Sequence, residues 1–405
     1  MVCNMNKICE NKLCTGCSTC YSVCPVHCIK MVKDEFGFEH PIISDACIKC
    51  GLCVERCPIN NIYNKRNIDS LSEQKAFAAL SNSTILWKQS SSGGAFAEIC
   101  KAWGNRQTLI CAAKWEGFAV KHEFVVGIDN IEPLQKSKYM SSSIGNSFVK
   151  IKKYLEDQNS VLFCGTPCQV AGLRSFLNKD YDNLLLIDLI CHGVGSPDVF
   201  ISCIKVLEQQ FKCSIASYSF RQKKGGYRKD HIEKIETSNG KKILIDNDPY
   251  IQLFTSQRCL RESCGKNCKF RTIKRQGDIT IGDFKHLSDV FPDLIGSKRN
   301  FSTIVFNTLK GSKLIEPLGQ SMLLRACNID TIVKYNPVFG RQSWAAEDRN
   351  MFFSDYHKDK QKAISKWSTP ARKYKLSLFG KIFDYIPIKL RKIVLQGGIY
   401  GKKYN

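Results

Sequence analysis

Short apolar runs alternate with amphipathic stretches through the middle of the chain, from residue 75 to about residue 220. Apolar runs of this length, bounded by turn residues, predict buried strands, whereas apolar positions three or four residues apart predict helices. Strands are expected on this basis at residues 108–113, 161–164 and 184–190. Helices are expected at residues 94–103, 144–155, 169–177 and 198–211. Strands that alternate with helices favour an α/β body with a largely buried sheet.

The regions on either side of this alternation follow other patterns. Residues 218–245 favour hairpins, with Asn239-Gly240 as a turn. Further strands are expected at residues 278–282 and 301–307, and past residue 336 the pattern weakens. The first 67 residues are dense in cysteine, and a polar stretch at residues 64–73 is typical of a linker. The domains expected are residues 1–67, 75–220, 221–345 and 346–405.

Composition narrows the class of protein. The chain has 405 residues, 43% of them hydrophobic and 24% charged, which suits a folded protein of two or three domains. Its 22 cysteines are spread over a chain far too long for a small disulfide-stapled scaffold. The sequence has no apolar stretch typical of a signal peptide and no run that approaches 18 apolar residues. We therefore expect a cytoplasmic protein whose clustered thiols are reduced and bind metal or act in catalysis.

The cysteine-rich first segment contains an internal repeat. Cys14, Cys17, Cys20 and Cys24 return with the same spacing as Cys47, Cys50, Cys53 and Cys57, and a proline follows each copy. In this spacing, three cysteines bind one [4Fe–4S] cluster and the fourth binds the other cluster. The spacing is that of bacterial two-cluster ferredoxins. It predicts one cluster on Cys14, Cys17, Cys20 and Cys57, and a second on Cys47, Cys50, Cys53 and Cys24.

Two alternatives apply to this segment. A pair of structural zinc sites would need only four ligands each, usually as two separated pairs, and does not require this repeat of eight cysteines. Cys3, Cys9 and Cys28 fall outside the repeat and are interpreted as ordinary free thiols.

The body carries two further segments with candidate chemistry. Residues 90–96 combine Ser and Gly at a helix start, where free backbone N–H groups favour a phosphate, although a serine-rich helix cap without a ligand fits as well. Residues 165–169 and 191–197 each follow an apolar strand and precede a helix, which is where α/β folds place ligands. His192 in the second of these is either catalytic or a packed histidine.

The motifs SSSGGAF, SKYMSSSIGN, LFCGTPCQVAGLR, LICHGVGSP and SCGKNCKF…GDITIGDF occur in this order. Together they resemble the coenzyme F420 hydrogenase/dehydrogenase beta-subunit family over residues 10–345. The likeness is greatest to bacterial members with an N-terminal two-cluster ferredoxin, which are often associated with surface-polysaccharide gene clusters. The resemblance implies an α+β ferredoxin-like module, an α/β flavin-binding body with a mixed sheet, and a resident FAD fed by iron–sulfur clusters.

The resemblance also implies roles for particular residues. Lys138 and His192 are its candidate catalytic residues. The flavin site would include Ser91, Ser92, Gly93, Gly94, Lys138, Tyr139, Gly165, Thr166, Pro167, Gln169 and Arg221. Lys223 either adds positive charge near the phosphates or belongs to a solvated basic loop.

A third cluster site is implied by Cys259, Cys264 and Cys268, with a fourth ligand from Cys168 or Cys191. Typical family members have two residues between the last two cysteines, and this chain has three. Gly265 lies beside the extra residue, so a loop can absorb it. Three ordinary thiols, or a site broken by the extra residue, are the alternatives.

The last residues form a basic tail. Residues 358–405 carry eleven Lys and two Arg against two Asp, out of a formal net charge of +23. Mixed apolar and cationic stretches of this kind suit the anionic inner face of a membrane, a partner protein or a solvated end. The chain has no recognised nucleic-acid-binding motif, so nucleic acid is not an expected partner.

The main functional hypothesis is an iron–sulfur flavoprotein oxidoreductase. It would pass electrons between a ferredoxin-type partner protein and FAD, with hydride exchange to a small substrate or a deazaflavin such as F420. The alternative is a non-catalytic electron-transfer subunit of a larger complex.

Overall fold

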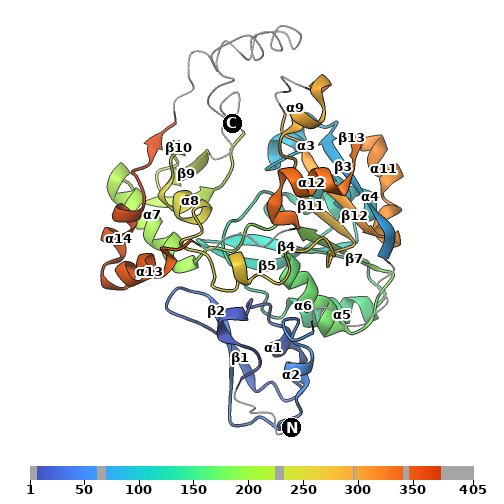
Figure 1. The fold of residues 1–405 in the computed structure, drawn as a ribbon, viewed down its shortest axis with the longest axis horizontal. Helices are drawn as coiled ribbons and strands as arrows, with labels where there is room; N and C mark the ends of the chain where they lie inside the picture. Colours follow the sequence, from blue (N-terminus) through green and yellow to red (C-terminus); the bar gives the residue numbers. More distant parts are fainter. Residues whose placement is uncertain are drawn as a thin grey trace.

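The structure is a computed structural model that describes residues 7–61, 70–223, 232–294, 297, 299–340 and 346–374 (Figure 1). It has a small N-terminal module at the bottom of this view and a body of two lobes above it. One lobe is built on a large central sheet, and the other on a smaller antiparallel sheet.

The N-terminal module is built on a hairpin and two short helices. Strand β1 (Ile29–Lys33) pairs antiparallel with β2 (Glu39–Ile43). The helices are α1 (Thr19–Val23) and α2 (Leu52–Glu55), and a 3₁₀ turn, η1 (Asn11–Leu13), precedes them. Cys24 directly follows α1 and Cys57 comes two residues after α2, so a helix separates the last cysteine of each repeat from the first two.

Within the described residues, the central sheet has the strand order β13-β3-β12-β11-β7-β6-β4-β5. The four inner strands β4, β6, β7 and β11 run parallel, and the remaining neighbours are antiparallel. The mixed sheet is therefore confirmed, as are all five strands expected in it. The strands are β3 (Ser70–Ser81), β4 (Leu109–Glu116), β5 (Ala119–Val126), β6 (Val161–Gly165), β7 (Leu184–Leu189), β11 (Ile279–Asp283), β12 (Ser302–Thr308) and β13 (Met322–Cys327).

Helices cover both faces of this sheet. Successive residues of β6 and β7 enter two separate buried clusters: Leu162 and Leu185 pack on one face, and Phe163 and Leu186 on the other. Burial on both faces explains why these strands are continuous apolar runs. The helices of this lobe are α3 (Thr84–Gln89), α4 (Ala95–Trp103), α5 (Ser147–Glu156), α6 (Pro167–Leu177), α9 (Leu287–Val290), α10 (Leu309–Ser312), α11 (Ile315–Ser321) and α12 (Ile329–Tyr335). Its 3₁₀ turns are η2 (Ile128–Asn130), η3 (Glu132–Leu134), η5 (Pro292–Leu294) and η6 (Pro337–Phe339).

The second lobe is built on a smaller sheet, in the order β14-β10-β9-β8. Its strands are β8 (Ile215–Ser219), β9 (Glu233–Thr237), β10 (Lys242–Asp246) and β14 (Arg372–Lys373). β9 and β10 form the hairpin expected around Asn239-Gly240. The helices are α7 (Pro197–Phe211), α8 (Pro249–Thr255), α13 (Arg349–Lys358) and α14 (Lys360–Trp367).

Part of the stretch that we assigned to a basic tail is folded into this lobe. Phe352, Phe353 and Tyr356 of α13 and Ile364 of α14 are buried in its core, and β14 pairs with β10. The sequence pattern missed these helices because their apolar residues are few and aromatic and lie among charged ones. The rest of the expected tail, residues 375–405, lies outside the described residues. In the described part of the chain, no helix combines the length and apolar character needed to cross a membrane.

The N-terminal module packs tightly against the body. A Cβ atom at Gly172 of α6 would lie 2.6 Å from Thr19 Oγ1 and 3.1 Å from Cys17 Cβ, so α6 approaches α1 very closely. Ser175 of α6 donates a hydrogen bond to the Arg56 carbonyl, and the ring of Phe36 packs 4.1 Å from that of Phe353. The module is therefore a fixed part of the molecule and is not held by a linker alone.

Candidate functional site

Two cavities in the N-terminal module each gather one predicted set of cluster ligands. The inner cavity is lined by Cys14, Cys17, Cys20 and Cys57. The outer cavity is lined by Cys24, Cys47, Cys50 and Cys53. The β1–β2 hairpin reverses the chain and returns the second repeat to the first. The geometry therefore matches the exchange of the fourth ligand that the spacing predicts.

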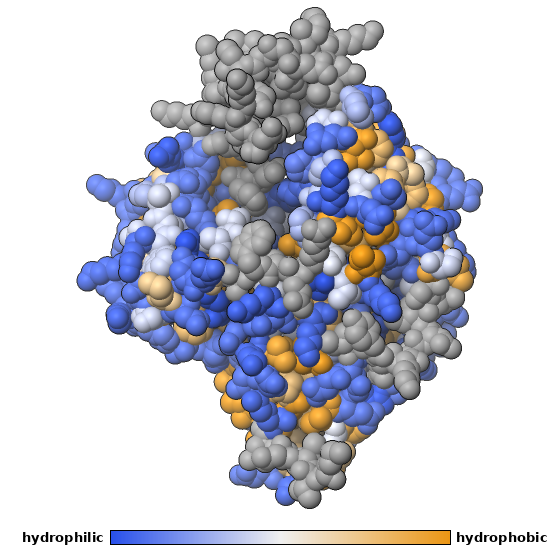
Figure 2. All heavy atoms as spheres, viewed as in Figure 1, coloured by the Kyte–Doolittle hydropathy of each residue, from blue (hydrophilic) through white to orange (hydrophobic). Residues whose placement is uncertain are grey.

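The two cavities differ in exposure. All four cysteines of the inner set are buried, whereas Cys50 of the outer set is exposed. Val26 and Ile48 line the outer cavity and are 41% and 60% exposed. Figure 2 shows hydrophobic residues gathered on the surface of this module. The outer cavity thus opens on a partly apolar surface, which suits contact with another protein.

Each cavity also contains a fifth thiol, which the sequence did not indicate. Cys9 lines the inner cavity and Cys28 the outer one. The sulfur of Cys28 lies 3.4 Å from that of Cys24. Both cysteines were interpreted as ordinary thiols because no spacing rule includes them, and Cys3 lies outside the described residues.

The arrangement of thiols favours clusters over zinc. Zinc draws four ligands to within about 2.3 Å of one point. Each cavity instead draws three cysteines from one repeat and one from the other, which is the pattern of two [4Fe–4S] clusters. The two cavities therefore fit [4Fe–4S] clusters.

A third cavity, the body cavity, lies where the module meets the body. It is lined by Cys168, Cys191, Cys264 and Cys268. The structure thus brings both candidate fourth ligands together with two cysteines of the predicted segment. The extra residue is absorbed by the 3₁₀ turn η4 (Gly265–Asn267), where Gly265 has a φ of +63°.

Cys259 does not lie in this set. It is 0% exposed and packs in the core of the second lobe, and it is not among the residues that line the body cavity. The backbone of this segment turns between Cys259 and Cys264, since the Cys264 N–H donates to the Arg261 carbonyl. We therefore replace the predicted set of ligands with Cys168, Cys191, Cys264 and Cys268.

Polar atoms around the body cavity fit an anionic group. Within the described residues, Arg261 Nη1, Arg271 Nη1 and Arg271 Nε are buried without a hydrogen-bond partner, as are the hydroxyls of Thr15 and Ser263. All four residues line the cavity. Leaving buried guanidinium groups unpaired is costly. A [4Fe–4S] cluster with four thiolates is negatively charged and presents sulfur acceptors, so these donors suit it.

Burial disfavours ionisation of three thiols of this cavity. Burial raises the pKa of the Cys264 thiol to about 12. Burial also raises the pKa of Cys168 and of Cys191 above the ordinary value. A bound metal deprotonates a thiol outright, so iron would provide the missing compensation.

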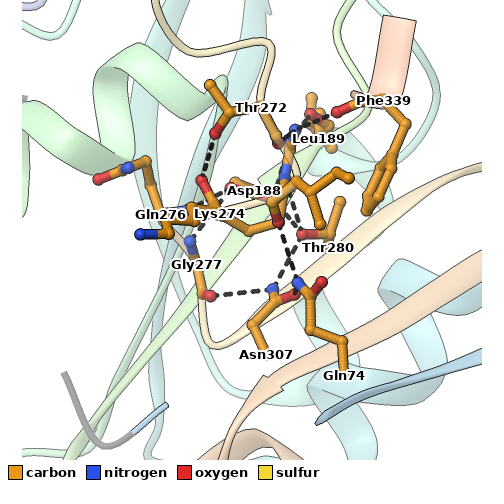
Figure 3. A network of polar contacts seen from close by, with 12 residues as sticks. Gln74, Asp188, Leu189, Thr272, Lys274, Gln276, Gly277, Thr280, Asn307 and Phe339 are labelled. Carbon is orange, nitrogen blue, oxygen red and sulfur yellow. Dashed lines mark hydrogen bonds and ion pairs between the residues drawn. The ribbon is translucent and has the colours of Figure 1, made fainter. Parts of the chain in front are cut away.

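A buried polar network holds two walls of the body cavity together (Figure 3). Asp188, near the end of β7, accepts hydrogen bonds from Arg275 Nη2 at 3.1 Å and Thr280 Oγ1 at 2.6 Å. It also accepts from the backbone N–H groups of Gln276 and Gly277. The side chains of Asp188 and Arg275 are almost fully buried. The network joins the strand before Cys191 to the loop that follows Cys268.

The Ser-Gly segment of the predicted flavin site sits beside the central sheet. Ser92 Oγ donates to the Phe301 carbonyl, and a Cβ at Gly93 would collide with the Ala79 carbonyl oxygen. Ser91 Oγ accepts from the Ser137 N–H at 2.8 Å. Gly94 caps α4 with a φ of +99°, but the first turn of α4 holds buried Glu98. Close packing explains why residue 93 is a glycine. The carboxylate of Glu98 disfavours a phosphate at the start of α4.

Positive charge nevertheless converges beside Ser92. Arg221 pairs with Asp283 at 2.7 Å, and its Nη1 lies 3.4 Å from Tyr139 Oη. Lys223 Nζ donates to the Ser92 carbonyl and lies over the Trp87 ring. Burial lowers the pKa of Lys223 to about 7. This grouping of Ser92, Tyr139, Arg221 and Lys223 is the part of the predicted flavin site that the structure brings together.

The two candidate catalytic residues are constrained. Lys138 Nζ donates to the carbonyls of Leu134, Gln135 and Lys136, and burial lowers its pKa to about 7. Burial, together with nearby Arg271, lowers the pKa of His192 to about 4, so the ring is neutral near pH 7. The carbonyl of His192 accepts from Arg271, which ties the residue to the body cavity.

The residues expected at the second edge of the flavin site lie elsewhere. Thr166 and Pro167 line the body cavity beside Cys168. Gly165 ends β6, and Gln169 forms a capping box with Thr166 at the start of α6. These residues flank Cys168 at the start of α6.

The exchange of ligands makes a prediction that iron content can test. Cys17→Ala with Cys57→Ala removes two ligands of the inner cavity and should leave one intact cluster in the module, about four irons. Cys50→Ala with Cys57→Ala removes one ligand from each cavity and should leave no intact cluster there. Cys9→Ala is the matched control and should retain both. The reverse result for the two double variants, measured by iron analysis and EPR, would contradict the exchange.

Comparisons with known proteins identify two domains in this chain. Residues 13–61 match the 4Fe-4S dicluster domain, and residues 158–331 match the C terminus of the beta subunit of coenzyme F420 hydrogenase/dehydrogenase. The chain is 20% identical over 334 residues to the F subunit of the F(420)H(2) dehydrogenase of Methanosarcina mazei, which covers 78% of this chain and 85% of that one. It is 24% identical over 325 residues to a coenzyme F420-dependent sulfite reductase of Methanocaldococcus jannaschii, covering 76% of this chain and 46% of that protein.

Two other similarities are to a ferredoxin and to a solved structure. The N-terminal module is 38% identical over 48 residues to a 7Fe ferredoxin of Hydrogenibacillus schlegelii, which covers 12% of this chain and 56% of that one. A chain of the F420-reducing [NiFe] hydrogenase complex from Methanosarcina barkeri matches with a TM-score of 0.41 and 14% identity, covering 74% of this chain and 91% of that chain.

An iron–sulfur module joined to this body defines an electron-transfer subunit of the oxidoreductase class. The chain combines a 4Fe-4S dicluster domain at residues 13–61 with a domain at residues 158–331 that belongs to the C terminus of the coenzyme F420 hydrogenase/dehydrogenase beta subunit.

Proposed function

We propose that this chain is an iron–sulfur flavoprotein oxidoreductase. It exchanges electrons with a ferredoxin-type partner protein at the N-terminal module and serves hydride exchange with a small substrate or a deazaflavin in the body. Bound [4Fe–4S] clusters would supply single-electron steps, and bound FAD would supply the conversion between single electrons and hydride.

The observation that carries this proposal is the contact between the inner cavity and the body cavity. Thr15 lines both of them. Phe270 of the body cavity belongs to the same buried cluster of side chains as Cys20 and Cys57. Because Cys50 of the outer set is exposed, the cysteine sets form a series from the surface into the body.

Residues of the body would hold the FAD. A bound pyrophosphate would favour the charged form of Lys223, which lies in the same grouping as Arg221, and the Ser92 carbonyl orients Lys223. Support for FAD comes from this grouping and from the family resemblance.

One observation favours the alternative of a non-catalytic subunit. The amino group of Lys138 is held by three backbone carbonyls, so it is not free to act on a substrate. In this alternative a partner protein performs the chemistry. Any link to surface-polysaccharide biosynthesis would then belong to this alternative. Contact of residues 375–405 with the inner face of a membrane is a separate proposal.

Anaerobic purification followed by iron, sulfide and flavin analysis tests the proposal. We expect one FAD per chain, released by heat, together with about twelve irons from three clusters. The protein alone should then reduce or oxidise a soluble hydride carrier. Full iron with no flavin would overturn the flavoprotein assignment, and flavin without turnover would favour the non-catalytic alternative.

A further inference from the structure

One buried arginine links the inner cavity of the module to the body cavity. Arg261 belongs to the body and is only 3% exposed. Its backbone N–H donates to the Val194 carbonyl at 2.9 Å, and its carbonyl accepts from the Cys264 N–H at 2.9 Å. The residue is therefore anchored in the same loop as Cys264, and it lines the body cavity.

The guanidinium group reaches across the interface into the module. Its Nε donates to the Cys14 carbonyl at 2.7 Å, and its Nη2 donates to the Glu39 carbonyl at 2.7 Å. Nη2 also lies 3.8 Å from the sulfur of Cys14. A Cβ at Gly16 would lie 2.9 Å from Nη1, so a glycine is needed where the arginine enters.

The third nitrogen of this group is unsatisfied. Nη1 is buried and, within the described residues, has no hydrogen-bond partner. A buried cationic side chain is rarely left with an unpaired donor unless an anion lies nearby. Arg261 thus contacts a predicted ligand of the inner cluster and lines the body cavity. It does not line the outer cavity.

We propose that Arg261 is a positioning residue that sets the direction of electron transfer between the cysteine sites. This inference rests on the proposed function, because it requires clusters in the inner and body cavities. A reduced cluster carries one more negative charge than an oxidised one, and a buried cation favours the more negative form. Arg261 therefore raises the reduction potentials of the inner and body sites relative to the outer site. One electron shared between the outer and inner sites would then be shifted toward the inner site.

Redox titration of the full-length anaerobic protein, monitored by EPR, tests this inference. Arg261→Gln removes the charge and keeps a polar side chain of similar length. In this variant we expect the ratio of reduced inner site to reduced outer site to fall at least tenfold. A tenfold change equals about 59 mV for a one-electron couple. Arg261→Lys keeps the positive charge, so its reduction potentials should lie close to those of the unsubstituted protein. Arg258→Gln is the matched control, because Arg258 pairs with Asp348 away from the cavities, and its potentials should equal those of the unsubstituted protein.

A measurement on the unsubstituted protein applies even if the variants lose iron. The outer site is exposed at Cys50, so a soluble paramagnetic ion should broaden its EPR signal more than that of the buried sites. During stepwise reduction, the signals that resist broadening should appear first. Reduction of the broadened signal first, or unchanged potentials in an Arg261→Gln variant with full iron, would overturn the role of Arg261. Protein without clusters would instead overturn the proposed function.

Discussion

Replacing Cys264 and Cys268 together with alanine should remove about four of about twelve irons per chain and leave both ferredoxin-module signals intact. The two residues are half of the thiols that line the body cavity. A cluster left with two ligands is not retained. Flavin reduction by the protein donor should slow as well, because the series of cysteine sites would then be broken between the module and the body.

The matched control for this variant lies in the same segment. Cys259→Ala removes a thiol that packs in the core of the second lobe and not at the cavity. It should retain all of the iron, although it leaves a small void in the core. Iron and sulfide analysis with EPR is the measurement. Equal iron loss in Cys259→Ala, or an unsubstituted protein reproducibly at about eight irons, would contradict a cluster in the body cavity.

The substitution Asp188→Asn should destabilise the body by about 3–5 kcal/mol, the usual cost of breaking a buried ion pair by removing one partner. Both oxygens of Asp188 accept hydrogen bonds, from Arg275 and Thr280 on one side and from two backbone N–H groups on the other. An amide presents one acceptor and turns an NH₂ group toward donors. Arg275 would keep its charge with no anion in contact.

The loss of stability in Asp188→Asn should affect the body cavity before it affects the N-terminal module. The network joins the strand before Cys191 to the loop after Cys268, so its failure should release the iron of the body cavity first. Denaturant unfolding under anaerobic conditions, followed by fluorescence and by iron release, measures both effects. Asp293→Asn, which loses a surface pair with Arg325, should cause no comparable change. Equal effects of the two substitutions would contradict a special role for the buried network.

Local sequence was sufficient for the N-terminal module. Its ligands are spaced by a rule that depends on a few consecutive residues, and the exchange between repeats follows from the same rule. The inner strands of the body were also predictable, because burial on both faces of a parallel sheet requires continuous apolar runs such as residues 161–164 and 184–189.

Strand β3 and the last helices were not predictable in this way. Strand β3 is rich in alanine, a poor strand former, and is held in the sheet by pairing with β12 and β13, far along the chain. The helices α13 and α14 acquire their stability from the core of the second lobe and not from their own pattern.

The sequence by itself determined that this protein carries two sets of four cysteines in exchanged order and that further cysteines follow two inner strands of a parallel sheet. Only the tertiary structure decided which of those cysteines meet. Strands β6 and β7 pair in parallel, so Cys168 and Cys191, which follow them, share one edge of the sheet. Cys264 and Cys268 line the same cavity, whereas Cys259 turns away into a core. The tertiary structure also decided that Arg261 reaches Cys14, although 247 residues separate them. Contacts of this kind depend on the order of strands and on the packing of separate domains, which no local pattern of residues encodes.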